Sequence, residues 1–566
     1  MRKVQKTIAY FLPLYLVLAG SLFCINLQAQ ELQGDTLKSI SNFRKWYQNL
    51  LPTPYEGPKN KLLMPMAVGY TDFDDNIRNL QLLGKLQPEQ SLTIRPYILT
   101  PKLAYDSILA MIDPEFENHG HLLERKHSDI QLLPINFLQK YNSHHPYGWN
   151  DGPLSFSKGY QFVGSGGVYM RWCNVHLTLR PEFFKTASDP YETNYEWGQR
   201  TSALNKLTLG QSSLRMDFGP LSFGVSTQNL WLGPGQYSSL LMSNNAQGFN
   251  HFSIATNRPL KTPIGSFEFS IIGGTLTANA KQGFEINNLY KLDSFVLKKE
   301  NRYLNLLSLT YNPLFFKNLY LGFNRAFQLT TQKNPSTNLK NYYLITLNSL
   351  FRNQYRDDGV PVDQLISGFV KYVFPKEHAE VYFEYGWNDG SSNLRDLTLE
   401  LSHSAASIFG LRKLQYLNKN NFLSIEVEAT KMAQSPGYLL RNAGNWYEHS
   451  YLKEGYTNEN QILGAGSGFG NNLQTIAISL NKGWTKYGIK FQHIAQNPLR
   501  LVSVWQNTYL GKVDWHDYSY GIILKQEHKN ILFNLNIDWV SSKNYLWQDN
   551  RKANNLFIFL NTIYLW

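Results

Sequence analysis

Cysteine is almost absent from this chain, which has two among its 566 residues. Cys24 lies in an amino-terminal segment that we expect to be removed, which leaves Cys173 alone. A lone cysteine excludes an intramolecular disulfide and a cysteine-based metal site, even in an oxidising compartment. Phe23 precedes Cys24 where a lipid-modified cysteine requires a small residue, so lipidation is not expected. Stability must therefore come from strand pairing and packing.

Long apolar runs are also missing. After the first thirty residues, no stretch reaches the roughly 20 apolar residues that a membrane-spanning helix needs. Residues 1–29 are predicted to be a cleaved signal peptide. Arg2, Lys3 and Lys6 form its positive region. A largely apolar stretch follows, and Ala29 is the small residue before the expected cut. A retained membrane anchor is the alternative interpretation.

Charge is sparse and unbalanced. Charged residues make up 17% of the chain, aromatic residues make up 14%, and the formal net charge is +12. Many aromatic residues without membrane helices fit a transmembrane β-barrel, and they also fit a secreted β-rich domain. Nucleic acid is not expected as the partner of an exported protein. A basic surface in an outer membrane would meet lipopolysaccharide phosphates or acidic polysaccharide, although most of these cations are expected to be solvated loop charges.

Residues 30–128 differ from the rest of the chain. Residues 37–51 carry apolar side chains at spacings of three or four, which predicts an amphipathic helix. A second short helix is predicted over residues 77–83, after an acidic start. A third begins at Pro101 and runs to about Ile112, since proline suits the first helical turn. We therefore expect a small, mainly helical domain here.

Residues 129–566 follow a period of two. In Ile531–Trp539 the odd positions are all apolar and the even positions include Asn534, Asn536 and Asp538. This alternation predicts strands with one face on lipid and the other on a wet lumen. At roughly 20 to 25 residues for a spanning strand with its connections, the segment provides about 18 to 22 strands. The aromatic end, Trp566, is typical of the closing strand of an outer-membrane barrel.

Bulky residues occupy several positions that this alternation assigns to the lumen, including Tyr382, Phe557 and Phe559. A plug inside the barrel would explain them. Misassigned faces in the last strand, where both parities are apolar, would explain them as well. The fold class is thus all-β, a transmembrane antiparallel barrel preceded by a small helical domain.

Two motifs combine aromatic faces with amide and hydroxyl groups. One is Ser226–Ala246, in which Gly233, Pro234 and Gly235 form a tight turn beside Trp231. Such groups suit sugars, whose C–H patches stack on rings and whose hydroxyls donate and accept. The residues predicted to contact carbohydrate are Trp231, Ser239, Asn244 and Asn245, with Tyr147, Trp149, Asn150 and Asp151 from the second motif. Interior loops need the same residue types for their own backbone, so a structural role remains open.

The segment Trp231–Gly235 followed by Ser239–Ala246 resembles the signature of the Wzi capsule-assembly family of outer-membrane proteins. Leu232 stands where family members more often carry a second tryptophan. Further resemblance, to Bacteroidetes-type members, extends in order over Ile77–Leu86, Thr93–Tyr97, Leu133–Phe137, Tyr141–Gly152 and Tyr456–Gly466. It covers nearly all of the mature chain.

This resemblance implies an 18-stranded barrel with its helical domain on the periplasmic side. It also implies an outer-membrane lectin that helps attach capsular polysaccharide to the cell surface, without catalysis and without a cofactor. The implied partners are capsular or other surface polysaccharide, outer-membrane lipid and lipopolysaccharide, and the polysaccharide export machinery. We expect a monomer.

Two other functions compete with this one. A porin-like channel or transporter would use the lumen for diffusion. An enzyme that modifies polysaccharide or lipid would need a nucleophile, a base and an orienting group, and no Gly-x-Ser-x-Gly elbow occurs beside a plausible triad. Glu426 and Glu428 share a strand face as glycosidase carboxylates do, but acids that line a lumen explain them more simply. His144 and His145 would point to opposite faces of a strand, so no metal site is predicted.

Overall fold

The computed structural model describes residues 68–69, 73–86, 90–97, 105–112, 119–125, 128–191, 203–278, 301–330, 362–388, 402–418, 421–434, 445–449, 452, 454–497 and 513–566. The predicted signal peptide and the predicted helix over residues 37–51 lie outside these ranges. Among the described residues, no helix is long and apolar enough to cross a membrane.

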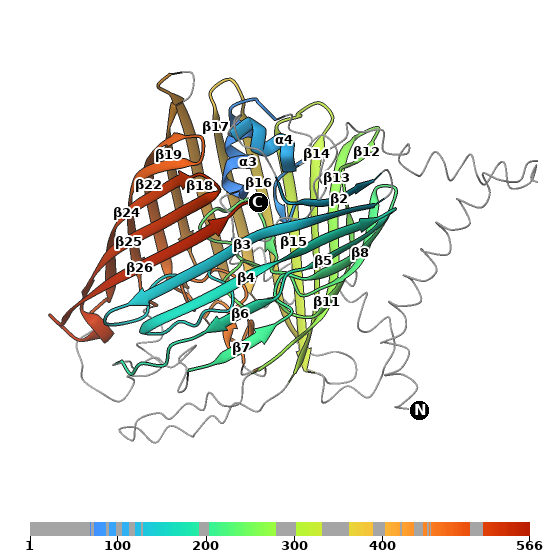
Figure 1. Cartoon of the computed structure of the whole chain (residues 1–566). Helices are drawn as coiled ribbons and strands as arrows, with labels where there is room; N and C mark the ends of the chain where they lie inside the picture. The colour runs from blue at the N-terminus through green and yellow to red at the C-terminus, as the bar shows by residue number, and fades with distance from the viewer. Residues whose placement is uncertain are drawn as a thin grey trace, which may run out of the picture.

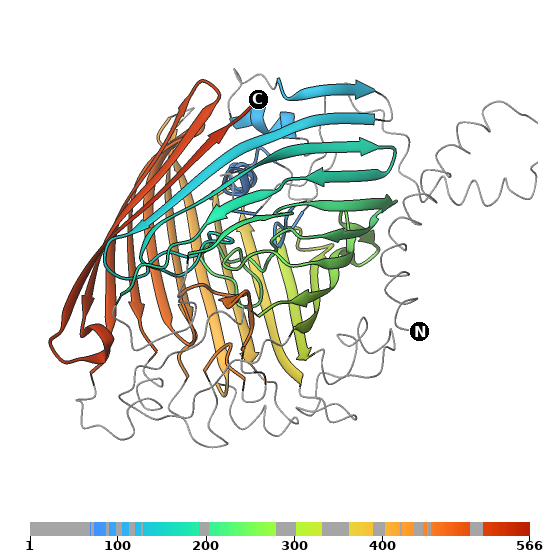
Figure 2. The ribbon, with the colours of Figure 1, turned by 60° about the horizontal axis from the view of Figure 1, so that its bottom comes forward.

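The described strands close into one antiparallel barrel, in which the last long strand pairs with the first (Figure 1, Figure 2). Its unbroken strands are β3 (Ser128–Asn142), β4 (Gly159–Trp172), β9 (Leu221–Ser226), β13 (Gly265–Leu276), β14 (Arg302–Pro313), β15 (Leu319–Thr330), β16 (Val362–Phe374), β17 (Ala379–Asn388), β18 (Ala405–Tyr416), β19 (Asn421–Lys431), β22 (Asn472–Lys482), β23 (Thr485–Ala495), β24 (His516–His528), β25 (Ile531–Lys543) and β26 (Lys552–Tyr564).

Three further strands of the barrel are each interrupted. They consist of β5 (Val175–Leu179) with β6 (Glu182–Lys185), β7 (Asn205–Thr208) with β8 (Ser213–Phe218), and β11 (His251–Thr256) with β12 (Leu260–Thr262). With each pair counted once, the described chain has an 18-stranded barrel, which confirms the predicted fold class. β2 (His121–Arg125) lies beside the first part of β3.

The two ends of the barrel differ in their connections. Short turns follow β16, β22 and β24, at residues 375–378, 483–484 and 529–530. The C-terminus lies at this short-turn end, as do the helices (Figure 1). The opposite, long-loop end carries long connections, such as the 40 residues from 432 to 471 between β19 and β22. Outer-membrane barrels place short turns in the periplasm and long loops outside.

The predicted alternation of faces is confirmed in β25. Phe533 and Trp539 face outward and are exposed, whereas Asp538 is buried inside, where it forms an ion pair with Lys490 at 3.1 Å. Inward aromatic residues are used in packing. The ring of Phe557 lies 5.3 Å from that of Tyr147, which belongs to a connection folded into the lumen. The lumen is therefore filled by protein at this level.

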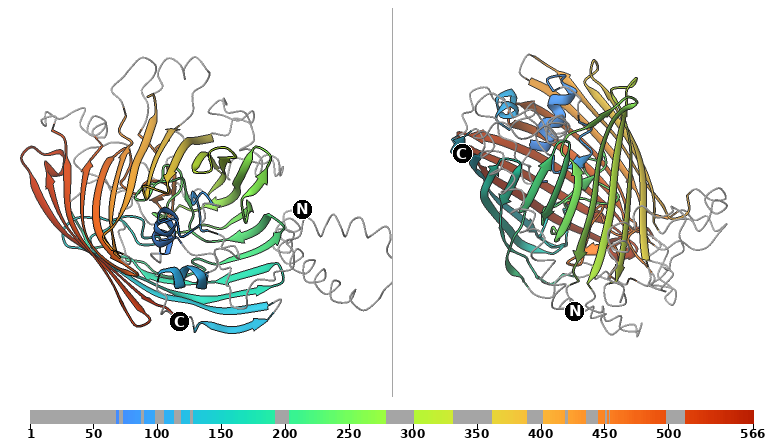
Figure 3. Two further views of the ribbon diagram at one scale, coloured as in Figure 1. Left: turned by 90° about the horizontal axis from the view of Figure 1, so that it is seen from above. Right: turned by 90° about the vertical axis from the view of Figure 1, so that its right-hand side faces the viewer.

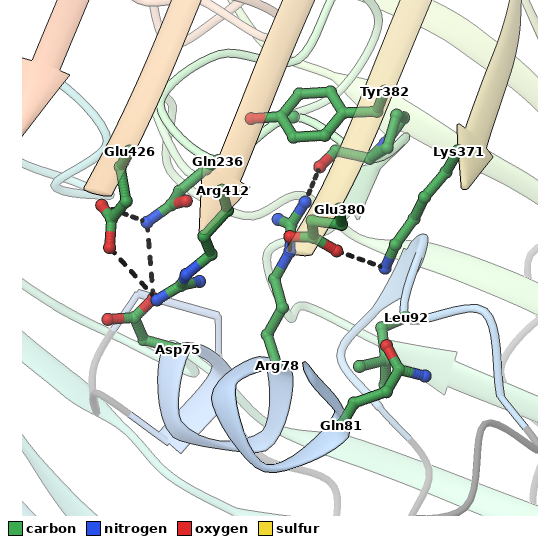
Figure 4. Close-up of polar contacts among 12 residues, drawn as sticks. Asp75, Arg78, Gln81, Leu92, Gln236, Lys371, Glu380, Tyr382, Arg412 and Glu426 are labelled. Atoms are coloured by element: carbon green, nitrogen blue, oxygen red, sulfur yellow. Dashed lines mark hydrogen bonds and ion pairs between the residues drawn. The ribbon is translucent and has the colours of Figure 1, made fainter. Parts of the chain in front are cut away.

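Helix α3 (Phe73–Leu82) lies within the ring of strands, and α4 (Tyr105–Ile112) lies nearby (Figure 3). Helix α3 overlaps the helix predicted over residues 77–83 but begins at Phe73, and α4 ends at Ile112 as predicted; the predicted start at Pro101 lies outside the described residues. The apolar side chains of the two helices pack on inward residues of β3, β25 and β26. On the polar side of α3, Arg78 pairs with Glu380 and donates to the Pro234 carbonyl at 2.8 Å. Asp75 of the same helix pairs with Arg412 at 2.6 Å (Figure 4). The boundary between a domain at 30–128 and the barrel stays a prediction.

Candidate functional site

The glycine-proline motif forms a turn inside the lumen. Trp231 and Leu232 make the short strand β10 (Trp231–Leu232), which pairs with β1 (Ile94–Arg95). Gly233 adopts a φ of 100°, and a Cβ at Gly235 would lie 2.0 Å from the Ser238 carbonyl oxygen. The turn therefore requires glycine at both positions, which supports the structural role predicted for this segment.

Trp231 is 3% exposed, and its ring is already engaged. The indole N–H donates to the Gly235 carbonyl at 3.1 Å, and the Arg95 guanidinium lies 4.8 Å from the ring centre. The hydroxyl of Ser239 is buried and donates to the Leu232 carbonyl. Both side chains thus stabilise the turn itself.

Glu426 and Glu428 on β19 anchor the next part of the motif. The backbone N–H groups of Gln236 and Tyr237 donate to Glu428 at 2.6 and 3.1 Å. The Tyr237 hydroxyl donates to Glu426 at 2.5 Å. The resemblance of these two acids to a glycosidase pair therefore has a structural explanation, since both carboxylates hold the inserted loop.

The two predicted motifs meet in the middle of the lumen. The side-chain amide of Asn244 donates to the carbonyl of Asn150 at 3.0 Å, and the N–H of Gly152 donates to the carbonyl of Asn244 at 2.8 Å. The amide of Asn150 in turn donates to the Tyr237 carbonyl at 2.9 Å. We name residues 147–152 and 226–246 together the septum, because they separate two cavities.

Neighbouring residues of the septum line different cavities. Trp149 and Asn245 line a cavity near the long-loop end, the outer cavity, whereas Asn150 and Asn244 line a cavity beside α3, the inner cavity. Charged residues dominate the inner cavity, namely Asp74, Asp75, Arg78, Arg95, Arg412, Glu426, Lys486, Lys490 and Lys525. Many of these charges pair with one another and so hold α3 in the lumen.

Aromatic side chains dominate the outer cavity. They are Tyr147, Trp149, Phe156, Tyr191, Phe469, Trp515, Tyr545 and Trp547. The ring centres of Trp515 and Trp547 lie 5.0 Å apart in an edge-to-face arrangement, and those of Trp515 and Tyr545 lie 5.1 Å apart. Rings from the β3–β4, β6–β7, β19–β22, β23–β24 and β25–β26 connections are thus brought to one place.

The turn that carries Trp547 has an unusual backbone. The short helix η4 (Tyr545–Trp547) includes Leu546 and Trp547 at φ values of 58° and 55°. Bulky residues rarely adopt this left-handed conformation. Where they do, the strained backbone is often part of a ligand site. The surrounding rings hold the turn in place.

Three residues that line the outer cavity each carry a buried polar atom with no hydrogen-bond partner within the described chain. These atoms are Nε2 of His145, Oγ of Ser467 and Nε1 of Trp547. Their residues are 4%, 7% and 5% exposed. A buried polar group without a partner costs about 1–3 kcal/mol. Residues of the inner cavity carry such atoms too, but only in the outer cavity do they occur among many aromatic rings.

The outer cavity carries little net charge. Asp151 pairs with Lys140 at 2.5 Å, and burial still raises the pKa of this carboxyl. Asp517 accepts hydrogen bonds from Trp515, Gln496 and Ser542. Burial lowers the pKa of His145 to about 3, so its imidazole is neutral near pH 7. Apart from the Asp517 carboxylate, which these three donors already engage, and the Lys140–Asp151 pair, the cavity presents rings and neutral polar groups.

The two histidines lie in a loop, so the argument that a strand would point them to opposite faces does not apply. Their Nδ1 atoms are 3.2 Å apart, and the His145 ring lies 5.1 Å from that of Tyr545. Among the described residues, no group of three or more potential ligands could hold a metal ion.

The predicted residues separate into three groups. Tyr147, Trp149, Asp151 and Asn245 line the outer cavity together. Trp231, Asn150 and Asn244 line the inner cavity, and Ser239 lies at neither. The sequence analysis missed Trp515, Tyr545 and Trp547. Tyr545 and Trp547 lie close together in a segment between two alternating strands, and this local aromatic cluster is the signal that points to them.

A closed barrel with outward apolar side chains, short turns at one end and a filled lumen defines an outer-membrane β-barrel protein. The chain belongs to the family described as capsule assembly protein Wzi, whose model matches residues 152–485. No match was found among curated proteins.

Several solved structures are similar. Wzi of Escherichia coli, described as an outer-membrane protein involved in Group 1 capsule assembly and as a carbohydrate-binding β-barrel, has a TM-score of 0.60 and 13% identity. The alignment covers 89% of this chain and all of that one. OccK5 (OpdH) of Pseudomonas aeruginosa has a TM-score of 0.38 and 8% identity over 78% of this chain and 99% of that one. OprD of the same organism has a TM-score of 0.35 and 7% identity, and the alignment covers 76% of this chain and 92% of that one.

Proposed function

We propose that this chain binds a carbohydrate segment of a surface polysaccharide in the outer cavity and thereby helps to assemble capsule at the cell surface. The observation that carries this proposal is a cavity lined by eight aromatic side chains and by three residues with an unpartnered, buried polar atom. Sugar hydroxyls both donate and accept, so they can satisfy an indole N–H, a serine hydroxyl and an imidazole nitrogen together.

The cavity also has the form that carbohydrate recognition requires. Binding sites for small ligands are concave, largely aromatic, and equipped with a few placed polar groups. Lys140 and Asp151 balance each other, and Asp517 is the one further acid of the lining, so the cavity has no excess of cations and suits a neutral sugar unit better than an acidic one. The family description and the Escherichia coli relative support the same class of ligand.

Binding, rather than diffusion or catalysis, is the activity that we propose. The septum and α3 both lie across the lumen, which argues against a wide channel. The paired acids Glu426 and Glu428 are occupied by the inserted loop. A barrel that closes within one chain leaves no free sheet edge, which agrees with a monomer.

The short-turn end suggests how the chain works with its partners. Helices α3 and α4 lie at that end (Figure 1). Short turns of outer-membrane barrels face the periplasm, the side from which exported polymer would arrive. We propose that polysaccharide export machinery delivers polymer to the cell surface and that the outer cavity retains it. A helical domain over residues 30–128 would then face that machinery.

Gene deletion tests this function in cells. We expect a strain without the gene to shed capsular polysaccharide into the medium, and complementation with the full chain to restore polymer on the cells. Quantifying polymer on cells and in the medium separates retention from synthesis. Unchanged retention after deletion would contradict the proposal.

A further inference from the structure

A row of basic side chains, two lysines and a histidine, lies on the outer, lipid-facing surface at the long-loop end. His516 pairs in register with Lys543 across β24 and β25, and Lys543 pairs in register with Lys552 across β25 and β26. All three lie on the outward faces of their strands, and both lysines are exposed. We name these three residues the cation row.

The row is electrostatically unfavourable by itself. Residues directly opposite each other on neighbouring strands have Cβ atoms about 5 Å apart, and like charges there are destabilising. Within the described chain, neither lysine ammonium group forms an ion pair. Two acids lie nearby in the sequence, Asp514 before β24 and Asp549 in the turn after β25. The same turn also carries Arg551, so these acids do not outnumber the basic residues around them.

A second histidine extends the row. Nε2 of His493 lies 3.0 Å from Nδ1 of His516, and the two rings are stacked with centres 5.1 Å apart. The ring of Tyr518 stacks on His493 at 4.9 Å. These side chains form a flat, polar surface next to the two lysines.

The depth of the row identifies the layer it meets. On the same outward faces, Tyr520 is 58% exposed and Trp539 is 49% exposed. Aromatic side chains form the girdle of such barrels at the membrane interface. The cation row lies four residues further toward the long-loop end on each strand, roughly 10 Å along the membrane normal for a tilted strand. That is the layer of lipid headgroups.

We propose that the cation row binds the phosphate group of a phosphorylated glycolipid in the outer leaflet. The phosphate would lie between Lys543 and Lys552 and offset their repulsion, with the His516 ring beside it. The sugar of the same headgroup would contact the neighbouring rings. This site is separate from the outer cavity, since it lies on the opposite face of the barrel wall.

Lipid titration of the purified full chain in detergent tests this inference. The probe is bis-phosphorylated lipid A, with the dephosphorylated lipid and inorganic phosphate as comparisons, and the readout is retained lipid in native mass spectra. We expect Lys543→Gln to weaken binding roughly fivefold and the Lys543→Gln, Lys552→Gln double variant roughly 25-fold. Lys482→Gln is the matched control, because Lys482 is exposed on the outward face of β22 at the short-turn end.

Retention of the dephosphorylated lipid to the same extent would overturn the inference. So would equal loss in the Lys482→Gln control, or a site that inorganic phosphate occupies without any preference for the lipid. Heat-modified migration of each variant on gels verifies that the barrel has folded. Since the outer cavity is untouched, loss of polysaccharide binding is not expected in these variants, which separates this result from the proposed function.

Discussion

Asn244 donates its side-chain amide to the backbone carbonyl of Asn150 at 3.0 Å, and this contact joins two loops that are 94 residues apart in the sequence. The same asparagine accepts from the amide of Asn229 at 2.5 Å. Because the joined loops form the septum, a few amide contacts separate the outer cavity from the inner one.

Asn244→Ala should therefore open the septum. Loss of these contacts removes the donor to the Asn150 carbonyl and one of the two acceptors of the Asn229 amide, which still donates to Ala246. A buried polar group left unsatisfied costs about 1–3 kcal/mol of folding free energy. We expect a lower unfolding midpoint and a higher conductance in planar bilayers. Asn554→Ala, an exposed position on the lipid-facing side of β26, is the control. Unchanged conductance and stability would show that the septum does not depend on this side chain.

Gly235→Ala should prevent the lumenal turn from forming. The added Cβ would lie 2.0 Å from the Ser238 carbonyl oxygen, a distance that forces the backbone to move. We expect loss of the heat-modified gel migration that marks a folded barrel. At Gly368 the nearest atom to an added Cβ is 3.8 Å away, so Gly368→Ala should fold normally. Normal folding of both variants would contradict the role of Gly235.

Acid should loosen the outer cavity through His145. Burial lowers the pKa of this imidazole from 6.5 to about 3, so the folded protein favours the neutral form. Above pH 6.5 the imidazole is neutral in both states and the free energy of unfolding is unaffected. As the pH falls from 6.5 toward 3, only the unfolded state gains the proton, so the free energy of unfolding falls by up to about 1.4 kcal/mol per pH unit.

Urea unfolding of the detergent-solubilised protein, followed by tryptophan fluorescence at pH 7 and pH 5, measures this loss. We expect His145→Gln to reduce the difference between the two pH values. His528→Gln, at an exposed position on the outer surface, should leave it unchanged. An identical pH difference in the wild type and in His145→Gln would show that another group is responsible.

Much of the barrel could be predicted from the sequence, because lipid on one side and a lumen on the other force alternation along every strand. Phe533 and Asp538 were assigned to their faces on that basis. The cavities could not be predicted in the same way. Adjacent residues such as Trp149 and Asn150 line different cavities, and only the path of the loop through the lumen decides which.

The aromatic part of the outer cavity illustrates the same limit. Trp515 and Trp547 are brought together by the pairing of β24 with β25, which places His516 opposite Lys543 at the end of both strands. Nothing in the local sequence around either tryptophan indicates its partner. The chemistry predicted for the site, rings with amides and hydroxyls, was right for the cavity although half of the predicted residues lie elsewhere.

Carbohydrate binding in the outer cavity is tested most directly by calorimetric titration of the full chain with purified fragments of capsular polysaccharide. The wild type should bind, and Trp547→Phe should weaken binding about tenfold, because it removes an indole N–H that a sugar hydroxyl would satisfy. Trp484→Phe is the matched control, since Trp484 is a buried tryptophan with an unpartnered Nε1 at the short-turn end. Equal weakening in both variants, or no binding by the wild type, would contradict the account.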